Sequence, residues 1–198
     1  MSQVDSLLLH AQRGENKEIQ NIITRGTSVN SADDHGFTAL HWAARMNQIE
    51  VVKTLLSYRN FSSLSIFLFF LNFVSIIVYY FYYFVLFLNN ISFHFILFFV
   101  FCFHFIEAQS LKNDEGSTPL HFAASKGHVE IIHLLVKISD VNEKNRFGDT
   151  PLHFAVRWGH VDAVSALKEA GADSTIKNAR GDTPIQETSN DRILKILL

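Results

Sequence analysis

The sequence has little cysteine and little proline, with Cys102 and three prolines among its 198 residues. A single cysteine excludes an intramolecular disulfide, and no Cys-x-x-Cys or His-Glu-x-x-His pattern provides a zinc ligand set. A phosphate-binding glycine loop, a kinase signature and a Gly-x-Ser-x-Gly nucleophile turn are also missing. We therefore expect a protein that is not an enzyme and that uses no metal or cofactor.

The sequence also has no excess of charge of one sign, because 17 basic and 19 acidic residues give a net charge of −2. Nucleic-acid-binding domains carry a clustered basic face, so we expect no nucleic-acid partner. The N-terminal segment has no basic n-region, and its apolar run Leu7, Leu8, Leu9 is too short for a signal peptide. These absences favour a cytoplasmic location for the folded part.

Charge is absent from one long stretch, residues 60–106, where 47 consecutive positions contain no Asp, Glu, Lys or Arg and 15 are Phe. The segments on either side, residues 1–59 and 107–198, have the charge content of an ordinary globular domain. This contrast divides the chain into three parts, two of which resemble each other.

The two flanking segments contain a repeated phrase. It reads Thr38-Ala-Leu-His-Trp-Ala-Ala, Thr118-Pro-Leu-His-Phe-Ala-Ala and Thr150-Pro-Leu-His-Phe-Ala-Val, and a weaker copy starts at Thr183. Thr118 and Thr150 are 32 residues apart, and Thr150 and Thr183 are 33 apart. Counting back one period from Thr38 reaches Asp5, which predicts a degenerate first repeat.

Each repeat predicts a pair of helices. In the third repeat Thr118 is an expected N-cap, Pro119 suits the first helical position, and Gly127 suits the left-handed turn that ends the helix. Apolar residues at helical spacing then predict a second helix that starts near Val129. One such pair cannot bury its own apolar stripe, so the pairs are expected to stack.

The period and the Thr-Pro-Leu-His-x-Ala-Ala, Gly-His and Asp-Val-Asn patterns resemble ankyrin repeats. This resemblance implies an all-α solenoid of about five helix-turn-helix units with projecting β-turns and a shortened last unit. It also implies a monomeric, non-enzymatic scaffold that binds another protein through its concave surface.

Residues 60–106 fit this scheme as an insertion into the second repeat. Thr38 and Thr118 are 80 residues apart, and subtracting one period of 33 leaves 47, the length of the charge-free run. Two interpretations are open. The narrow residue vocabulary fits a retained intron read in frame, whereas the length of the apolar segment suits a transmembrane hairpin that anchors the protein to a membrane.

The projecting turns and the first helices are the expected binding surface, because Trp, Tyr and Arg dominate interface energetics. The predicted partner-binding residues are Asp33, Asp34, His35, Phe37, Trp42, Arg146, Phe147 and Trp158. We align Trp158 with Asn47 and Lys126 of the other copies. The recurring His41, His121 and His153, like His128 and His160, are interpreted as structural hydrogen-bonding residues rather than metal ligands.

Within the ankyrin family, the segment Asp33-Asp-His-Gly-Phe-Thr-Ala-Leu-His-Trp-Ala-Ala and the aromatic Trp158 before a glycine resemble the N-terminal domain of integrin-linked kinases. That resemblance implies that Trp158 and Phe147 face a LIM-domain adaptor. It also raises the alternative that the chain is the truncated front end of such a kinase-like protein.

Overall fold

The computed structural model describes residues 2–59 and 111–198. The chain divides into two compact units, the first formed by Met1–Leu56 and Ser110–Leu198 and the second by Ser57–Gln109. Nearly all of the second unit, including the predicted intron or transmembrane hairpin, lies outside the described residues. None of the helices formed by the described part of the chain is long and apolar enough to cross a bilayer.

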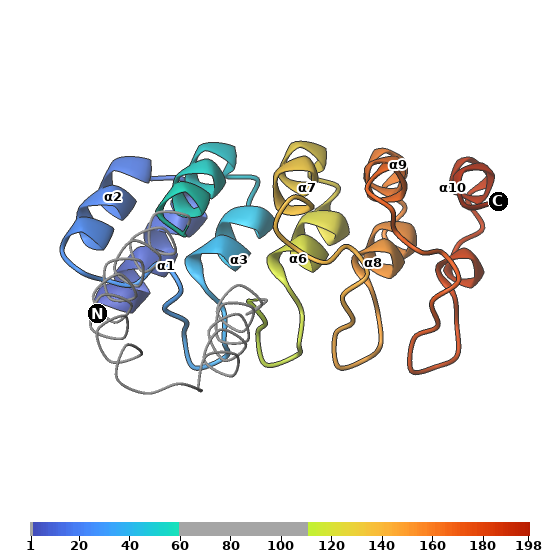
Figure 1. The fold of residues 1–198 in the computed structure, drawn as a ribbon, viewed down its shortest axis with the longest axis horizontal. Helices are drawn as coiled ribbons and strands as arrows, with labels where there is room; N and C mark the ends of the chain where they lie inside the picture. Colours follow the sequence, from blue (N-terminus) through green and yellow to red (C-terminus); the bar gives the residue numbers. More distant parts are fainter. Residues whose placement is uncertain (1, 60–110) are drawn as a thin grey trace, which may run out of the picture. The chain divides into compact units, whose positions relative to one another are not determined.

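The described residues form a row of helix pairs, in which we call the first helix of each pair inner and the second outer (Figure 1). The described bounds are α1 Gln3–Arg13 with α2 Asn16–Thr24, α3 Ala39–Arg45 with a helix over residues 49–59, α6 Pro119–Lys126 with α7 Val129–Leu135, α8 Pro151–Arg157 with α9 Val161–Glu169, and the 3-10 helix η1 Pro184–Glu187 with α10 Asp191–Leu197. These five pairs, numbered repeats 1 to 5, confirm the predicted all-α arrangement of paired helices.

The local signals of the third repeat have the predicted roles. Thr118 is the extended N-cap of α6, Pro119 is its first residue, and Gly127 ends it with φ of 70° in the left-handed region. The N-cap bond differs from a simple hydroxyl cap, because the backbone N–H of Thr118 donates to Nδ1 of His121 at 3.1 Å. Thr38 and Thr150 make the same bond to His41 and His153.

The first helix departs from the predicted register. Asp5, which matches Thr38 in the repeat count, is not the N-cap, because α1 already begins at Gln3. Ser2 caps it instead, accepting a bond from the Asp5 backbone at 3.0 Å, and the Asp5 carboxylate accepts from the Ser2 backbone at 2.9 Å. A serine three residues before an acid closes a capping box, and this local bond pair overrides the repeat register.

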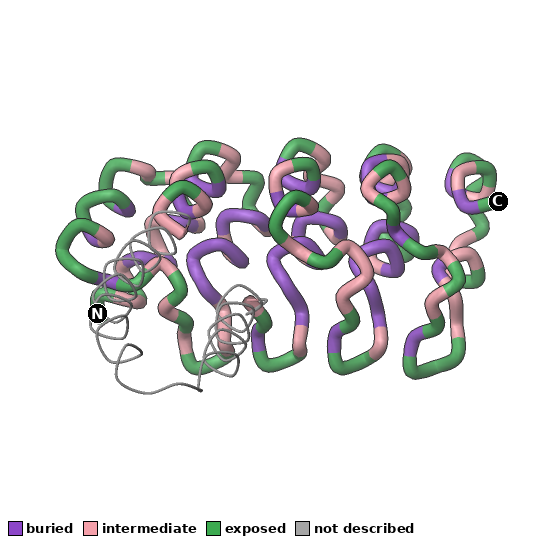
Figure 2. The backbone as a smooth tube through the Cα atoms, viewed as in Figure 1, coloured by how far each residue is buried: buried purple, intermediate pink, exposed green. Residues whose placement is uncertain are grey.

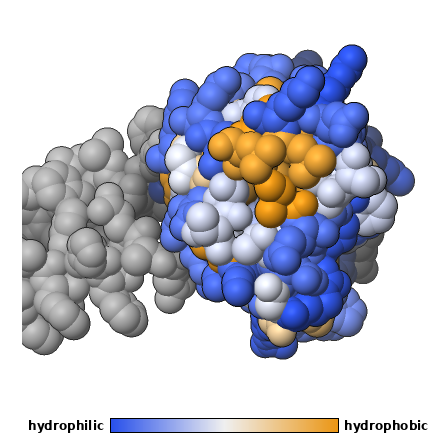
Figure 3. Space-filling model, turned by 90° about the vertical axis from the view of Figure 1, so that its right-hand side faces the viewer, coloured by the Kyte–Doolittle hydropathy of each residue, from blue (hydrophilic) through white to orange (hydrophobic). Residues whose placement is uncertain are grey.

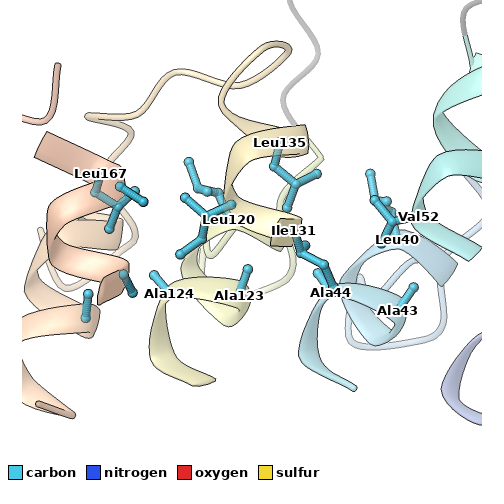
Figure 4. Packing of buried hydrophobic residues seen from close by; sticks show 14 of the residues in the cluster. Leu40, Ala43, Ala44, Val52, Leu120, Ala123, Ala124, Ile131, Leu135 and Leu167 are labelled. Atoms are coloured by element: carbon cyan, nitrogen blue, oxygen red, sulfur yellow. The ribbon is translucent and has the colours of Figure 1, made fainter. Parts of the chain in front are cut away.

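The core runs continuously between inner and outer helices. Figure 2 shows buried residues concentrated on the inner helices and exposed residues on the turns. Small side chains let the inner helices approach one another, as with Ala43 and Ala44 on α3 and Ala123 and Ala124 on α6, all fully buried (Figure 4). Larger side chains fill the space above them, and the fully buried Leu120, Ile131 and Leu135 are among these.

Repeats 2 and 3 pack directly on each other although residues 60–110 separate them in sequence. Helix α3 contacts α6, and the backbone N–H of Asp114 donates to the carbonyl of His35 at 2.9 Å. Gly36 shows how close this approach is, because its φ is 76° and a Cβ there would lie 2.9 Å from Cα of Asn113. The described residues on either side of the interruption therefore form one stack.

At the C-terminal end, the polar residues of the last repeat do not cover the stack completely. Glu187 points back toward repeat 4, where it bonds to Arg157. Figure 3 shows apolar side chains gathered on the end face formed by the last repeat, where Leu198 is almost fully exposed.

Candidate binding surface

The projecting turns are built by one side chain in each repeat. In the turn before α8, Oδ1 of Asn145 accepts from the backbone N–H groups of Phe147 at 2.9 Å and Asp149 at 3.0 Å. Asp33, Asn113 and Asn178 hold their own turns in the same way. One oxygen of the predicted binding residue Asp33 is therefore committed to its turn.

Neighbouring turns are joined by backbone hydrogen bonds. Arg146 donates to the carbonyl of Glu115 at 2.8 Å, and Ala179 donates to the carbonyl of Phe147 at 2.9 Å. These bonds fix the spacing of the turn tips. The exposed side chains of Asp34, His35, Arg146 and Phe147 therefore project from an ordered row.

Buried histidines link each inner helix to the next repeat. Nε2 of His41 lies 3.1 Å from the Ser117 carbonyl, and His121 and His153 make the corresponding contacts with Asp149 and Asp182. Because Nδ1 accepts a backbone N–H, Nε2 carries the proton and donates to the carbonyl. Burial lowers the pKa of His41 and of His121 to about 4, although these hydrogen bonds oppose the shift.

A second set of contacts runs back to the preceding repeat. Nε2 of His128 lies 3.2 Å from the Arg45 carbonyl, and Nε2 of His160 lies 3.0 Å from the Ser125 carbonyl. Gln48 makes the equivalent bond to Gln12. All five recurring histidines thus make hydrogen bonds between repeats, which confirms their structural interpretation.

The first of two aromatic clusters on this surface consists of Phe37, Trp42, Arg45 and Phe122, which we call the Arg45 cluster. The Phe37 ring centroid lies 5.3 Å from that of Trp42 and 5.4 Å from that of Phe122. The Arg45 guanidinium lies over Trp42 at 5.4 Å and over Phe122 at 6.0 Å. All four side chains are partly exposed.

Arg45 has no acidic partner in the described part of the chain. No ion pair or side-chain hydrogen bond joins its guanidinium to any residue among 2–59 and 111–198. Among the described residues, the neighbours of the guanidinium are the rings of Trp42 and Phe122. The positive charge of Arg45 is therefore available to pair with a ligand.

The second cluster consists of Asp149, Phe154, Arg157, Asn178, Arg180 and Glu187, which we call the Arg157 cluster. Arg157 lies 5.5 Å over the Phe154 ring, Nη2 donates to Asp149 at 2.9 Å and to Glu187 at 2.8 Å, and Nε donates to Glu187 at 3.1 Å. Burial alone would lower the pKa of Arg157, but these bonds and the two negative charges raise it. Asn178 and Arg180 also bond to Glu187, whose side chain is only 6% exposed.

Trp158 and Phe147 are the most exposed of the predicted aromatic residues, at 63% and 57%. Phe37 and Trp42, by contrast, are partly buried, and Trp42 packs against the core. The alignment of Trp158 with Asn47 is wrong. Asn47 has φ of 59° and takes the left-handed position of Gly159, so Met46 is the residue equivalent to Trp158.

The predicted set omitted Phe122, Phe154, Arg45, Arg157 and Glu187. The signal for the first two was present, because they follow the histidine of the repeated phrase as Trp42 does. The arginines follow three residues later on the same helices, a spacing that brings two side chains together on one helix face.

Comparison with known families agrees with this geometry. A family model described as ankyrin repeats matches the chain in three copies, over residues 3–64 and 89–178. These ranges cover more than half of the chain, which therefore belongs to the ankyrin repeat family.

Palmitoyltransferase akr1 of Schizosaccharomyces pombe is similar to a short part of the chain, with 44% identity over 54 residues. This match covers 27% of the present chain and 8% of that protein. The chain thus spans only a small part of the length of this relative.

Proposed function

We propose that this protein is a non-enzymatic scaffold that binds another protein through the surface formed by its turns and inner helices. Ankyrin repeats are typically protein interaction modules. The observation that carries the proposal is the row of accessible aromatic and arginine side chains on a rigid backbone. Such side chains supply most of the energy in protein interfaces, and a rigid backbone loses little entropy on binding.

Trp158 and Phe147 are the proposed anchors for a partner of one particular kind. The resemblance to integrin-linked kinases suggests a LIM-domain adaptor. The high exposure of both rings supports this assignment, because neither ring is needed to fill the core of the stack. The adaptor is the finer part of the proposal, and the scaffold function does not depend on it.

Replacing Trp158 by Ala tests this anchor. If the ring is an interface hot spot, the variant should bind a LIM-domain adaptor more weakly by about 2 kcal/mol, as measured by isothermal titration calorimetry. Its thermal unfolding should hardly change, because most of the ring is exposed in the free protein.

Met46→Ala is the matched control, since Met46 has the same place in repeat 2 and is also an exposed apolar residue. Equal affinity of the Trp158 variant and the parent would remove Trp158 from the binding surface. No binding of the parent would reject the adaptor and leave other protein partners open.

A further inference from the structure

This inference concerns the Arg45 cluster and rests on the proposed scaffold function. Arg45 and Arg157 have the same position in repeats 2 and 4, each seven residues after the N-cap threonine. Each also lies over the aromatic residue three positions earlier on its helix. Arg157 nevertheless has two carboxylate partners, whereas Arg45 has none among the described residues.

The repeat register shows why Arg45 lacks such partners. Asp149 immediately precedes the N-cap Thr150, and the corresponding residue before Thr38 is Phe37. Glu187 is the fourth residue after the N-cap of the following repeat, and the corresponding residue after Thr118 is Phe122. Both positions that supply carboxylates to Arg157 therefore hold aromatic residues in the Arg45 cluster. Phe122 lies against the guanidinium, and Phe37 packs on the rings of Trp42 and Phe122.

We propose that the Arg45 cluster binds an acidic segment of the partner protein. A carboxylate of that segment pairs with the Arg45 guanidinium, and an adjacent apolar side chain rests on the rings of Phe37, Trp42 and Phe122. A guanidinium stacked on rings keeps its N–H donors directed outward in its own plane, where they match the two oxygens of a carboxylate.

The two helices that carry the cluster add positive charge to it and no carboxylate. Helices α3 and α6 contain no Asp or Glu, and their C-terminal turns carry Arg45 and Lys126. No ion pair joins Arg45 to the acidic residues of the neighbouring turns, which are Asp33, Asp34, Asp114 and Glu115. A single guanidinium beside an apolar wall fits one carboxylate next to an apolar residue better than a doubly charged phosphate.

A displayed library of short random peptides, selected on the full-length chain in detergent micelles, tests this inference. We expect the selected peptides to contain Asp or Glu next to an apolar residue. A selected peptide should bind about tenfold more tightly than the same peptide with its acid changed to the amide, as measured by fluorescence anisotropy. Arg45→Gln should abolish this difference.

Two variants serve as controls, with circular dichroism to check that each is folded. Arg157→Gln should keep the preference for the acidic peptide, because its guanidinium is already paired within the chain. Phe122→Glu places a carboxylate at the position equivalent to Glu187 and should reduce the preference by pairing with Arg45 from within the chain.

Peptides that bind without an acid, or an acid preference that survives Arg45→Gln, would overturn this inference and leave the scaffold function standing. A phosphoserine peptide that binds more tightly than its glutamate counterpart would overturn the choice of ligand. If no peptide is enriched over a control surface without the protein, both the inference and the proposed binding surface fall.

Discussion

The Arg45 and Arg157 clusters use the same scaffold positions for different purposes. In the Arg157 cluster, an arginine, two carboxylates and an amide from repeats 4 and 5 bond to one another, and the Glu187 side chain is almost buried. In the Arg45 cluster the arginine is surrounded by rings from repeats 2 and 3. The comparison teaches that, in a repeat protein, substitutions at two register positions decide whether an arginine joins repeats together or stays free for a ligand.

The largest expected effect is a loss of stability in acid that is caused by the buried histidines. These histidines occur beside both clusters, and the effect does not involve the carboxylates of the Arg157 cluster. Burial lowers the pKa of His41 and of His121 to about 4, below the ordinary 6.5 of the unfolded chain. The unfolded chain therefore binds more protons between these values. The free energy of unfolding should fall as the pH falls from about 6.5 to about 4, by roughly 3 kcal/mol per histidine at most.

Urea denaturation at several pH values measures this fall, and a His41→Gln, His121→Gln double variant is the control. Gln186 shows that glutamine can accept the N-cap bond, since its Oε1 accepts from the Thr183 backbone at 2.8 Å. The double variant should therefore stay folded and lose much of the acid sensitivity. An unchanged slope in that variant would mean that these two histidines do not cause it.

The next effect compares the two arginines directly. Arg157→Gln should lower the free energy of unfolding by about 2 kcal/mol, because it removes the positive charge with which both the Asp149 and the Glu187 carboxylates pair. Arg45→Gln should cost only about 0.5 kcal/mol, the size of an exposed cation–π contact. Thermal and urea unfolding of both variants at neutral pH measures the difference, and equal losses would contradict the distinction between the clusters.

The Arg157→Gln and Arg45→Gln variants should also differ in how their stability changes at acid pH. Burial by itself would raise the pKa of Asp149, but hydrogen bonds from Arg157 and Asn178 lower it below its ordinary 3.8. The stability that this carboxylate contributes is present above about pH 3.8 and is lost as the pH falls through its lowered value. Arg157→Gln should therefore weaken the pH dependence below 3.8, whereas Arg45→Gln should leave it unchanged.

The smallest expected effect concerns residues 60–106, which separate two parts of the Arg45 cluster in the sequence. Phe37, Trp42 and Arg45 precede residues 60–106 and Phe122 follows them, whereas the Arg157 cluster lies entirely beyond them. All the described contacts of the Arg45 cluster come from residues outside the run. Deleting residues 60–106 should therefore leave this cluster intact.

Trp42 fluorescence in a Trp158→Phe background measures this outcome, because the chain has only these two tryptophans. The emission maximum of Trp42 should be the same with and without residues 60–106. A shift to the emission of a fully exposed indole would show that the Arg45 cluster needs residues 60–106. Of the two clusters, only the Arg157 cluster would then be independent of those residues.

Much of the fold followed from the sequence because each repeat carries its own local signals. Thr118, Pro119 and Gly127 fix the ends of α6, and recurrence of the same residues in other copies fixes the stack. The first helix was harder to place, since the Ser2–Asp5 capping box is a local feature outside the repeat pattern.

The binding surface was less predictable. Exposed rings such as Trp158 were found because they stand out from the repeat, but Arg45 and Arg157 look equivalent in the sequence. Their difference depends on residues in other repeats, Phe122 for one and Glu187 for the other. Contacts of this kind require the register of the whole stack, which a reading of single motifs does not provide.

The closure of repeat 2 on repeat 3 has a consequence for the order of folding. His41 reaches Ser117 across 76 residues of chain, whereas the equivalent bond from His121 to Asp149 spans 28. If the intervening residues contributed only length, the loop-closure entropy of the longer connection would cost about 1 kcal/mol more. Contacts between distant residues form more slowly. Repeats 3 to 5 are therefore the expected folding nucleus, and the Arg45 cluster is completed when repeats 1 and 2 dock onto it.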